Sequence, residues 1–243
     1  MFYLNVSTHL KMRKTITILA LILTMTISVN AQFDLGLTGI PSLSTFHVKD
    51  QDLSDTYIYP VNYGLSLNYH FDRFMFSSGV LHFTQGRKFE FEKTSTNNPE
   101  GTGEYYDVYF RARSIMIPLL ANYKFIETSK STFFAGTGIY TGYIYSQKWE
   151  DTSIPEDWKP DPSVNYPYPV GRFTEQDAFN DFYFGLNIGI GWNQKISENL
   201  SLQLRPNFLY QLREDQPKST NAWTNRMMTW ALDFGIYYRL EKK

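Results

Sequence analysis

Histidine is the residue in this chain with the widest range of chemistry, because a neutral imidazole can transfer protons or bind a metal ion. After residue 31 the chain contains three histidines, His47, His70 and His82. No two of them lie at the spacing of metal ligands, and neither His47 nor His82 has an acid and a serine nearby that would complete a nucleophile–base arrangement. His70 falls in a short predicted turn. The sequence therefore predicts no catalytic residue, no metal site and no cofactor.

Five charged residues have a different potential chemistry, because each stands on the polar face of a segment in which polar and apolar residues alternate. They are Asp34, Lys195, Arg205, Asp233 and Arg239. If these faces meet inside a closed structure, an unpaired buried charge is strongly destabilising, so ion pairs are expected. Two outcomes are open: a charge-paired plug that holds the structure closed, or a path for protons or ions.

The exposed segment best suited to binding is 146–179, in which five prolines stand among aromatic residues. Its candidate contact residues are Trp149, Trp158, Tyr166 and Tyr168. Proline stiffens a loop and so lowers the entropy lost on binding, and exposed aromatic rings can stack on glycans or grip a protein. The alternatives are a lid folded over the mouth of the molecule and a binding surface for an external ligand.

The elements that carry these residues have a period of two almost throughout, which indicates β-strands. In 181–195, DFYFGLNIGIGWNQK, the apolar residues from Phe182 to Trp192 share one face, while glycine, asparagine and charged residues share the other. The segments 57–70, 200–213 and 228–240 repeat this pattern, 33–43 shows a shorter version, and only 73–91 has an ambiguous phase. There are about eight such segments, many of them much longer than the usual strand of about 5–6 residues.

The two faces of these segments differ in a way that identifies their surroundings. Aromatic residues make up 17% of the chain and gather on the apolar face, where amphipathic rings suit a membrane–water interface. A soluble ligand-binding barrel would place its large apolar residues inside and its charges outside. Here the second face is small or polar, as in a transmembrane β-barrel. A closed barrel is also the only sheet that leaves no backbone group unpaired in lipid.

The links between the segments give a second line of argument. Long links at 47–56, 92–104, 146–179 and 213–226 alternate with short ones at 70–74, 127–131 and 196–199. Outer-membrane barrels have short periplasmic turns and long extracellular loops, and a chain that starts and ends on one side needs an even number of strands. The prediction is an all-β fold, an eight-stranded antiparallel up-and-down transmembrane β-barrel in the outer membrane. Side chains fill the interior of a barrel of this size, so open diffusion through it is not expected.

The start of the chain predicts export. Met12-Arg13-Lys14 gives a basic region, 15–29 is apolar, and Ala31 ends a small-residue cleavage site. This pattern indicates a signal peptide at 1–31, with Met12 as an alternative start, followed by the barrel domain at 32–243. The absence of cysteine excludes disulfides and thiolate metal sites. The formal net charge of −1 gives no reason to expect nucleic acid as a partner.

One strand resembles that of a known family. IMIPLLANYKF at 115–125 is similar to the proline-containing strand of the Bacteroidota outer-membrane β-barrel family that includes the PorT-like proteins. The segments FFAGTGIYTGY (133–143), DFYFGLNIGIGW (181–192) and LDFGIYYRL (232–240) resemble that family's fifth, sixth and last strands. The chain departs from the family at Met116, where an acidic residue is common, and at its end, RLEKK, where an aromatic residue is typical. The resemblance implies an outer-membrane protein without a particular activity.

The residues and the resemblance together lead to one expected function and two alternatives. The expected function is a structural or interaction role without catalysis, in which long extracellular loops meet a ligand and outer-membrane lipid or lipopolysaccharide surrounds the barrel. The first alternative, implied by the PorT-like relatives, is an accessory barrel of type IX secretion with a secretion-machinery protein as partner. The second is a lipid-modifying outer-membrane enzyme, which the histidines do not favour.

Pro118 interrupts the most apolar run of the mature chain, RSIMIPLL at 113–120. Proline removes a backbone donor and is confined within sheets to edges, strand starts and bulges. We expect a β-bulge here, which would shift the phase and turn Arg111 and Arg113 into the lumen. Without a bulge, Pro118 would face the lumen and both arginines would point outward, at the level of lipopolysaccharide phosphates.

Overall fold

The structure is a computed structural model that describes residues 32–48, 57–92, 105–152, 154, 173–175, 181–212 and 225–240. The predicted signal peptide at 1–31 lies outside these residues. Every regular element in the described part is a β-strand. In that part no helix is long and apolar enough to cross a membrane.

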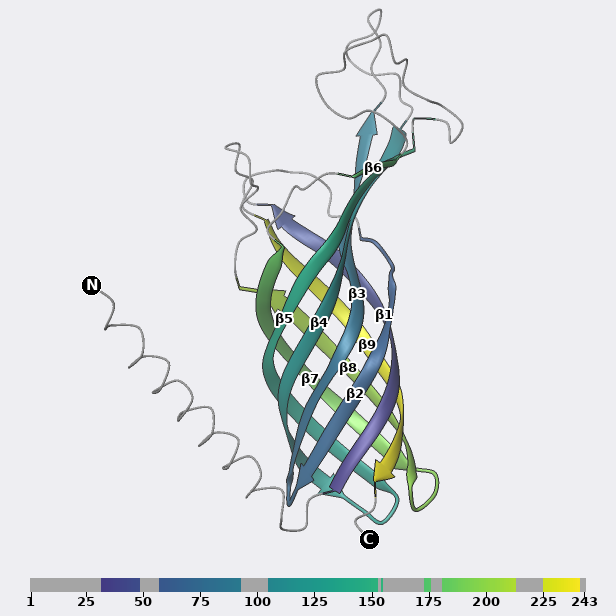
Figure 1. Cartoon of the computed structure of the whole chain (residues 1–243), viewed down its shortest axis with the longest axis vertical. Coiled ribbons are helices and arrows are strands. Elements are labelled where there is room, and N and C mark those ends of the chain that lie inside the picture. Colours follow the sequence, from purple (N-terminus) through teal and green to yellow (C-terminus); the bar gives the residue numbers. More distant parts are fainter. Residues whose placement is uncertain are drawn as a thin grey trace, which may run out of the picture.

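Eight long strands and one short strand make up the described sheet. They are β1 (Gln32–Val48), β2 (Val61–Phe71), β3 (Phe74–Glu92), β4 (Tyr105–Glu127), β5 (Ser131–Asp151), β6 (Phe173–Glu175), β7 (Phe182–Lys195), β8 (Leu200–Gln211) and β9 (Asn225–Leu240). Neighbouring long strands pair antiparallel along the chain, β5 pairs with β7, and β1 pairs with β9 to close the ring. The short β6 pairs with the end of β5 outside the ring. The predicted eight-stranded up-and-down barrel is therefore confirmed (Figure 1).

The short turns all lie at one end of the barrel, here termed the turn end (Figure 1). Asp72 and Arg73 join β2 to β3 in a two-residue hairpin closed by the pair Phe71–Phe74. Asp72 has a φ of 48°, a left-handed conformation that such hairpins favour and that aspartate tolerates better than most residues. Residues 128–130 and 196–199 form the other two turns. The long links join the strands at the opposite end, the link end, so the predicted alternation of links is confirmed.

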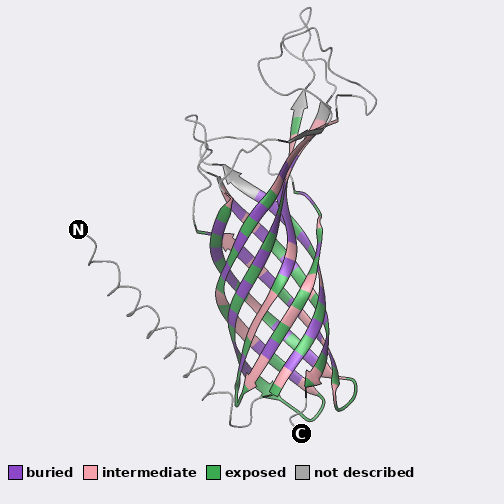
Figure 2. Cartoon of the chain, in the orientation of Figure 1, coloured by how far each residue is buried: buried purple, intermediate pink, exposed green. Residues whose placement is uncertain are grey.

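Burial alternates along the strands in the sense expected for a membrane barrel (Figure 2). On β7 the outward side chains of Ile188 and Ile190 are 60% and 61% exposed, whereas Tyr183 on the inward face is 1% exposed. Polar residues such as Asn68 and Arg205 are buried inside. Large apolar side chains thus cover the outer wall, which is stable only where lipid replaces water.

The ambiguous phase of 73–91 has a physical cause. In β3 the inward residues include Met75, Leu81 and Phe83, which are buried, while Phe74 and Val80 are exposed on the outer wall. Both faces of this strand thus carry large apolar residues. Hydropathy alone could not separate the two faces.

Pro118 lies within β4 without a bulge, so the bulge predicted there is wrong. Every residue from 115 to 120 pairs with β5 in one register, with Pro118 opposite Tyr140. On the other side the β3–β4 register is the same before and after the proline, and only the two pairs nearest to it are missing. The ladder loses a local contact, but the phase of β4 does not change.

The barrel accommodates two further prolines in the same way. Around Pro41 the β1–β9 register continues from Gly39–Phe234 to Ser42–Ala231. Around Pro206 the β7–β8 register likewise continues across a two-pair gap. At each proline, the strand that lacks the backbone N–H donor loses the adjacent residue pairs with one of its two neighbouring strands. The register between the two strands is the same before and after the gap.

The unbroken phase of β4 decides where its arginines point. The β4–β5 register shifts between Arg113 and Ser114, but the extra residue there, Tyr145, belongs to β5. Pro118 consequently faces the lumen, and Arg111 and Arg113 lie on the outer face, with Arg113 exposed. This is the arrangement expected in the absence of a bulge at the proline.

Inward-facing glycines make room for aromatic rings in the lumen. A Cβ on Gly142 would collide with the ring of Tyr183, and a Cβ on Gly191 would collide with the ring of Phe134. Both rings are almost completely buried. The alternation of glycine and aromatic residues in β5 and β7 is thus explained by close packing across a narrow barrel.

Candidate functional site: a filled lumen and a projecting sheet

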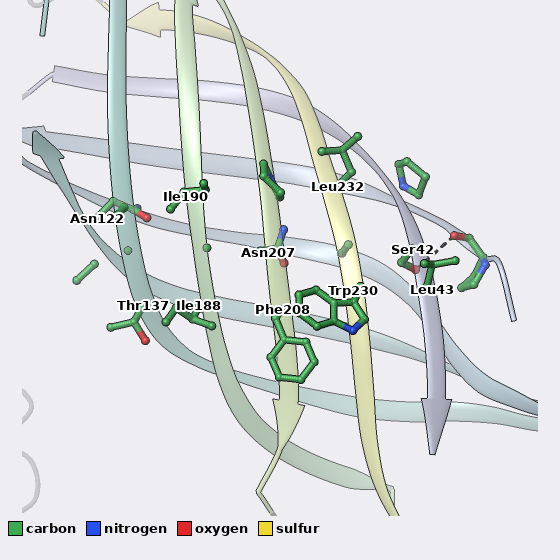
Figure 3. A pocket seen from close by; sticks show the side chains of 18 of the residues that line it. Ser42, Leu43, Asn122, Thr137, Ile188, Ile190, Asn207, Phe208, Trp230 and Leu232 are labelled. Atoms are coloured by element: carbon green, nitrogen blue, oxygen red, sulfur yellow. Dashed lines mark hydrogen bonds between the residues drawn. The ribbon is translucent and has the colours of Figure 1, made fainter. Parts of the chain in front are cut away.

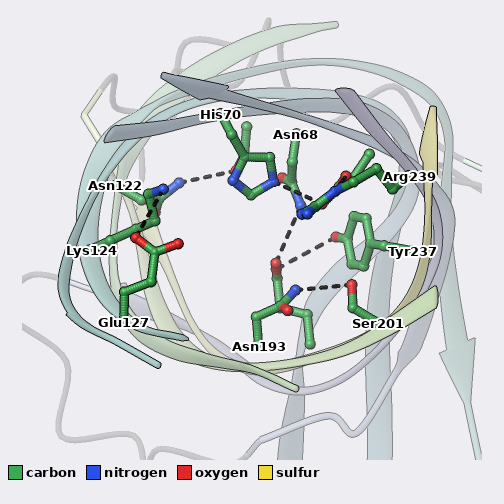
Figure 4. A network of polar contacts seen from close by, with 12 residues as sticks. Asn68, His70, Asn122, Lys124, Glu127, Asn193, Ser201, Tyr237 and Arg239 are labelled. Carbon is green, nitrogen blue, oxygen red and sulfur yellow. Dashed lines mark hydrogen bonds and ion pairs between the residues drawn. The ribbon is translucent and has the colours of Figure 1, made fainter. Parts of the chain in front are cut away.

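An ion-pair network crosses the lumen near the turn end (Figure 4). Asp34 is 1% exposed and accepts hydrogen bonds from Arg239 at 3.0 and 3.2 Å. Its carboxylate also lies 2.7 Å from Nε2 of His70. Strand pairing sets this geometry, because Asp34 and Arg239 are directly opposite each other on β1 and β9. The structure thus brings together two of the five predicted charges and adds a histidine.

Neutral side chains extend the network across the lumen (Figure 4). Asn68 donates a hydrogen bond to Gln203 at 3.3 Å, and Gln203 donates to the Tyr237 hydroxyl at 3.5 Å. Asn193 donates to the Ser201 hydroxyl at 3.2 Å. These groups come from β2, β7, β8 and β9, so they tie opposite walls of the barrel together. We term this set of residues the lower network: Asp34, Asn68, His70, Asn193, Ser201, Gln203, Tyr237 and Arg239.

The other predicted charges are arranged differently. Arg205 and Asp233 are opposite each other on β8 and β9, but no ion pair joins them among the described contacts. Arg205 donates to Asn187 at 3.4 Å, and Oδ1 of Asp233 has no hydrogen-bond partner in the described part of the chain. Both side chains line a small cavity of about 30 Å³, enough for about one water molecule. Lys195 lies half-buried near the turn end.

In the half of the lumen nearer the link end, buried polar side chains such as Ser44, Asn62 and Gln211 lie beside an apolar layer. Its buried residues form one cluster, here termed the upper cluster: Ile40, Leu81, Phe83, Phe110, Ala112, Met116, Tyr140, Ile144, Tyr183, Leu209, Met227 and Ala231. The Tyr183 hydroxyl lies 2.7 Å from the Ser114 hydroxyl, which donates to the backbone of Phe83. A charge-paired plug therefore describes only part of the lumen, and a hydrated ion would also have to cross a packed apolar layer.

Three strands continue beyond the barrel wall at the link end (Figure 1). β2 pairs with β3 only as far as Tyr63–His82, whereas the β3–β4 pairing runs on to Glu92–Tyr105. β5 continues to Asp151 and pairs with β6. At about 3.3 Å per residue, β4 extends about 25 Å beyond Arg113. We term residues 84–92, 105–112, 147–151 and 173–175 the projecting sheet.

An aromatic stack holds the base of the projecting sheet together. The ring of Trp149 lies 4.9 Å from that of Phe110 and 5.8 Å from that of Phe89, measured between centroids. Trp149 therefore belongs to β5 and packs between strands, and its predicted place in an exposed loop is wrong. β5 continues to Asp151, although the segment 146–151, SQKWED, has no apolar–polar alternation that would predict a strand. The other three candidate contact residues, Trp158, Tyr166 and Tyr168, lie outside the described residues.

Two buried polar side chains are not identified by the sequence patterns. His70 reaches the lumen because β2 continues to Phe71, one residue beyond the predicted start of the turn. Arg87 is 1% exposed and lies over the ring of Phe89 at 5.0 Å, in the segment with ambiguous phase. Phe83, Arg87 and Phe89 stand at alternate positions and therefore on the same face of β3. This period of two is the sequence signal from which an inward-facing arginine could have been predicted.

The outer face of the projecting sheet carries paired charges. Lys88 bonds to Glu90 at 2.7 Å and to Asp107 at 2.9 Å, and these bonds hold the pKa of Lys88 above its ordinary value. Arg111 bonds to Glu150 at 3.0 Å. The sheet therefore presents both signs of charge to solvent, a composition suited to a polar partner rather than to lipid tails.

Two apolar grooves lie on the described outer wall of the barrel. The larger has a volume of about 1150 Å³ and follows outward side chains such as Ile188, Phe208 and Trp230 (Figure 3). The second, of about 710 Å³, crosses β9, β1, β2, β3 and β4 around Gly39. No aspartate, glutamate, lysine or arginine lines either groove, which fits a surface in contact with acyl chains.

The histidines lie in different surroundings in the described part of the chain. No three metal-ligating side chains come together there, and no serine or threonine hydroxyl bonds to His70. His82 faces the outer wall, stacked on Tyr63 with 4.9 Å between ring centroids. The side chain of His47 lies outside the described part.

Comparison with known protein families identifies the membrane that contains this barrel. Residues 24–213 match the family described as outer membrane protein beta-barrel domain. The chain belongs to this family. The barrel therefore resides in the outer membrane, with its turn end toward the periplasm and its link end toward the outside. No curated protein sequence matches the chain.

Solved structures with a similar fold are themselves outer-membrane barrels. Neisserial surface protein A is 11% identical, with a TM-score of 0.44, over 84% of this chain and 96% of its own. Outer membrane protein W of Escherichia coli is 13% identical, with a TM-score of 0.40, over 84% and 98%. Ail, the attachment invasion locus protein of Yersinia pestis, solved with the heparin analogue sucrose octasulfate, is 13% identical, with a TM-score of 0.37, over 86% and 99%. These similarities concern the barrel fold alone.

Proposed function

We propose that this member of the family is a closed, non-catalytic outer-membrane barrel whose projecting sheet binds an extracellular partner. The observation that carries the proposal is the difference between the two ends of the barrel. The periplasmic end closes in short turns, whereas β3, β4 and β5 continue together on the extracellular side as a paired sheet joined by β6. Strands that are already paired lose little conformational entropy on binding, which favours a recognition surface.

The filling of the lumen supports an interaction role over transport. The lower network spans the periplasmic half with hydrogen bonds from four or more strands, and the upper cluster adds a packed apolar layer in the extracellular half. The cavity beside Arg205 has a volume of only about 30 Å³. A hydrated ion would have to displace both layers, so we propose that the barrel does not conduct.

The surroundings of the histidines support the absence of catalysis. A lipid-modifying enzyme would need a nucleophile and a base near the outer leaflet. At that level the described outer wall presents His82, which packs between the rings of Tyr63 and Tyr145 and hydrogen-bonds to no carboxylate in the described part. Asp34 does contact His70, but this pair is buried in the lumen close to the periplasmic turns and bonds to Arg239.

The proposal is tested by capturing partners on intact cells with a membrane-impermeant cross-linker. A deletion of 155–172 removes most of the β5–β7 link but keeps β5 and β6. A second variant, Lys88→Ser with Tyr109→Ser, changes the outer face of the projecting sheet. Both are expected to reduce capture of extracellular partners while heat-modifiable gel migration stays unchanged. Lys130→Ser, in a periplasmic turn, is the matched control. If all variants capture the same proteins, the interaction surface is not the projecting sheet.

A second candidate function is an accessory role in type IX protein secretion. It is supported by the similarity of IMIPLLANYKF (115–125) to the proline strand of the PorT-like proteins. In that case the partners would be periplasmic or inner-membrane secretion subunits, co-purified from detergent-solubilised outer membranes. A deletion strain that secretes its normal set of proteins would exclude this role.

A further inference from the structure

Arg113 occupies an unusual place on the outer face of β4. Below it, the outward residues from Ile115 to Phe125 are exposed apolar or aromatic side chains and the small Ala121. With a rise of about 3.3 Å per residue and a tilt of about 40°, this stretch covers about 25 Å of the barrel axis, the height of a membrane-embedded apolar band. Arg113 then lies about 5 Å above that band on the same scale, at the level of lipid headgroups.

The guanidinium of Arg113 is available at this level. The side chain is exposed, and no carboxylate pairs with it among the described residues. Its register neighbours on both sides are small hydroxyl residues, Thr84 on β3 and Ser146 on β5. This contrasts with Lys88, whose ammonium is already held by two carboxylates.

A second arginine stands immediately above the first. Arg111 contacts Glu150 through Nη1 at 3.0 Å and lies over the ring of Tyr109 at 5.1 Å, which leaves the rest of its guanidinium exposed. In register beside it are Gly86, which has no side chain, and Lys148, a third cation. The charge that this row offers a ligand therefore comes from the two arginines, because Lys148 is itself opposite Glu175 on β6.

An apolar groove begins directly below this row. The groove of about 710 Å³ is lined by Gly39, Tyr63, His82 and Ile115, which are paired in sequence across β1, β2, β3 and β4. Ile115 is only two residues below Arg113 on the same face of β4. A Cβ on Gly39 would meet nothing within 4 Å, so the floor of the groove is open. The groove and the arginines therefore form one continuous surface with a charged top and an apolar body.

We propose that this surface binds one phosphorylated glycolipid of the outer leaflet, with a phosphate on Arg113 and Arg111 and an acyl chain in the groove around Gly39. Arginine suits this role because its planar guanidinium can hold two phosphate oxygens at once. The Ser146 hydroxyl, which is partly exposed, adds a neutral donor at the same height. The surface favours a lipid over a soluble anion, because a soluble anion has no acyl chain to bury in the apolar groove.

The proposal is tested by counting bound lipids with native mass spectrometry of the full protein. The probe is diphosphorylated lipid A, mixed with lipid A from which both phosphates have been removed. The wild-type protein is expected to retain the diphosphorylated form preferentially. Arg113→Gln should lower that preference about fivefold, because one cation near a charged membrane surface contributes about 1 kcal/mol. Arg111→Gln with Arg113→Gln should abolish the preference.

Filling the groove provides an independent arm. Gly39→Phe occupies open space without a clash in the barrel wall, and it should reduce retention of both forms of lipid A. Ala135→Leu, in the larger groove, is the matched control and should change neither. Heat-modifiable migration verifies assembly of every variant, and added salt should weaken the preference of the wild-type protein itself. An unchanged preference in the double arginine variant, or unchanged retention in Gly39→Phe, would overturn the proposal.

Discussion

At the residue scale, the side chain whose contacts are expected to contribute most to the free energy of unfolding is that of Asp34. Its carboxylate is buried and holds both Arg239 and His70. Asp34→Asn removes the charge but keeps the volume, so Arg239 is left facing an amide inside the lumen. Removing one partner of a buried pair costs about 3–5 kcal/mol, and we expect a loss of that order in the free energy of unfolding, measured by urea titration in lipid vesicles.

The matched control for this substitution is Glu127→Gln. Glu127 pairs with Lys124 at 3.4 Å, but its side chain is 50% exposed. Exposed ion pairs contribute about 0–1 kcal/mol, so this change from carboxylate to amide should have little effect. Equal losses for the two substitutions would mean that the lower network does not stabilise the barrel.

At the element scale, the in-sheet prolines provide a test of strand pairing. Next to Pro118 the β3–β4 ladder lacks two pairs without a change of register. Pro118→Val keeps a similar volume and restores a backbone donor, so the unfolding free energy is expected to rise by about 1 kcal/mol, the net contribution of one hydrogen bond. Hydrogen exchange should show a protected amide at position 118. A loss of stability would instead mean that the proline ring is needed beside the cavity that it lines.

The projecting sheet depends on a different set of contacts. Trp149 is partly buried and packs against Phe110 and Phe89 above the membrane. Trp149→Ala should therefore loosen the sheet by about 2 kcal/mol, less than a large-to-small change at a fully buried aromatic residue. Faster hydrogen exchange is expected in 84–92 and 105–110, with unchanged exchange in β7 and β8. Phe182→Ala, on the lipid face, is the comparison variant. If β7 and β8 loosen as well, the projecting sheet and the barrel unfold as one unit.

The strands also show which structural features could be predicted from the sequence alone. The eight strands, their order and their lipid face follow from a period of two and from link lengths, because both patterns are local. The bulge at Pro118 was predicted wrongly, because the rule for proline in sheets does not include a ladder that omits pairs on one side. Arg87 was missed because both faces of β3 carry large apolar residues, and His70 because a strand end cannot be located to one residue.

The lumen contacts could be predicted only in part. That Asp34 and Arg239 meet depends on β1 pairing with β9, the closure of the barrel, which no local pattern specifies. Arg205 and Asp233 also lie opposite each other, yet their side chains turn to Asn187 and to a small cavity. Strand register determines which backbone positions lie opposite each other. The rotamer of each side chain, and therefore its contacts, depends on the packing of the whole interior.

At the scale of the whole molecule, the two halves of the lumen have different roles in keeping the barrel closed. The lower network is polar and could admit water if its ion pairs were broken. The upper cluster is apolar, and two of its rings, Phe110 and Tyr183, are completely or almost completely buried. The upper cluster should therefore act as the seal, while the lower network mainly joins the strands.

This difference predicts the behaviour of the protein in planar lipid bilayers. The wild-type barrel should give no stepwise conductance, and Asp34→Asn should be equally silent, because the upper cluster remains intact. Phe110→Ser with Tyr183→Ser removes two rings from the apolar layer and leaves a cavity lined by hydroxyl groups, which water can enter. Brief conductance steps are expected for this variant alone. Steps in the wild-type protein would contradict a closed barrel, and steps in Asp34→Asn would place the seal in the lower network instead.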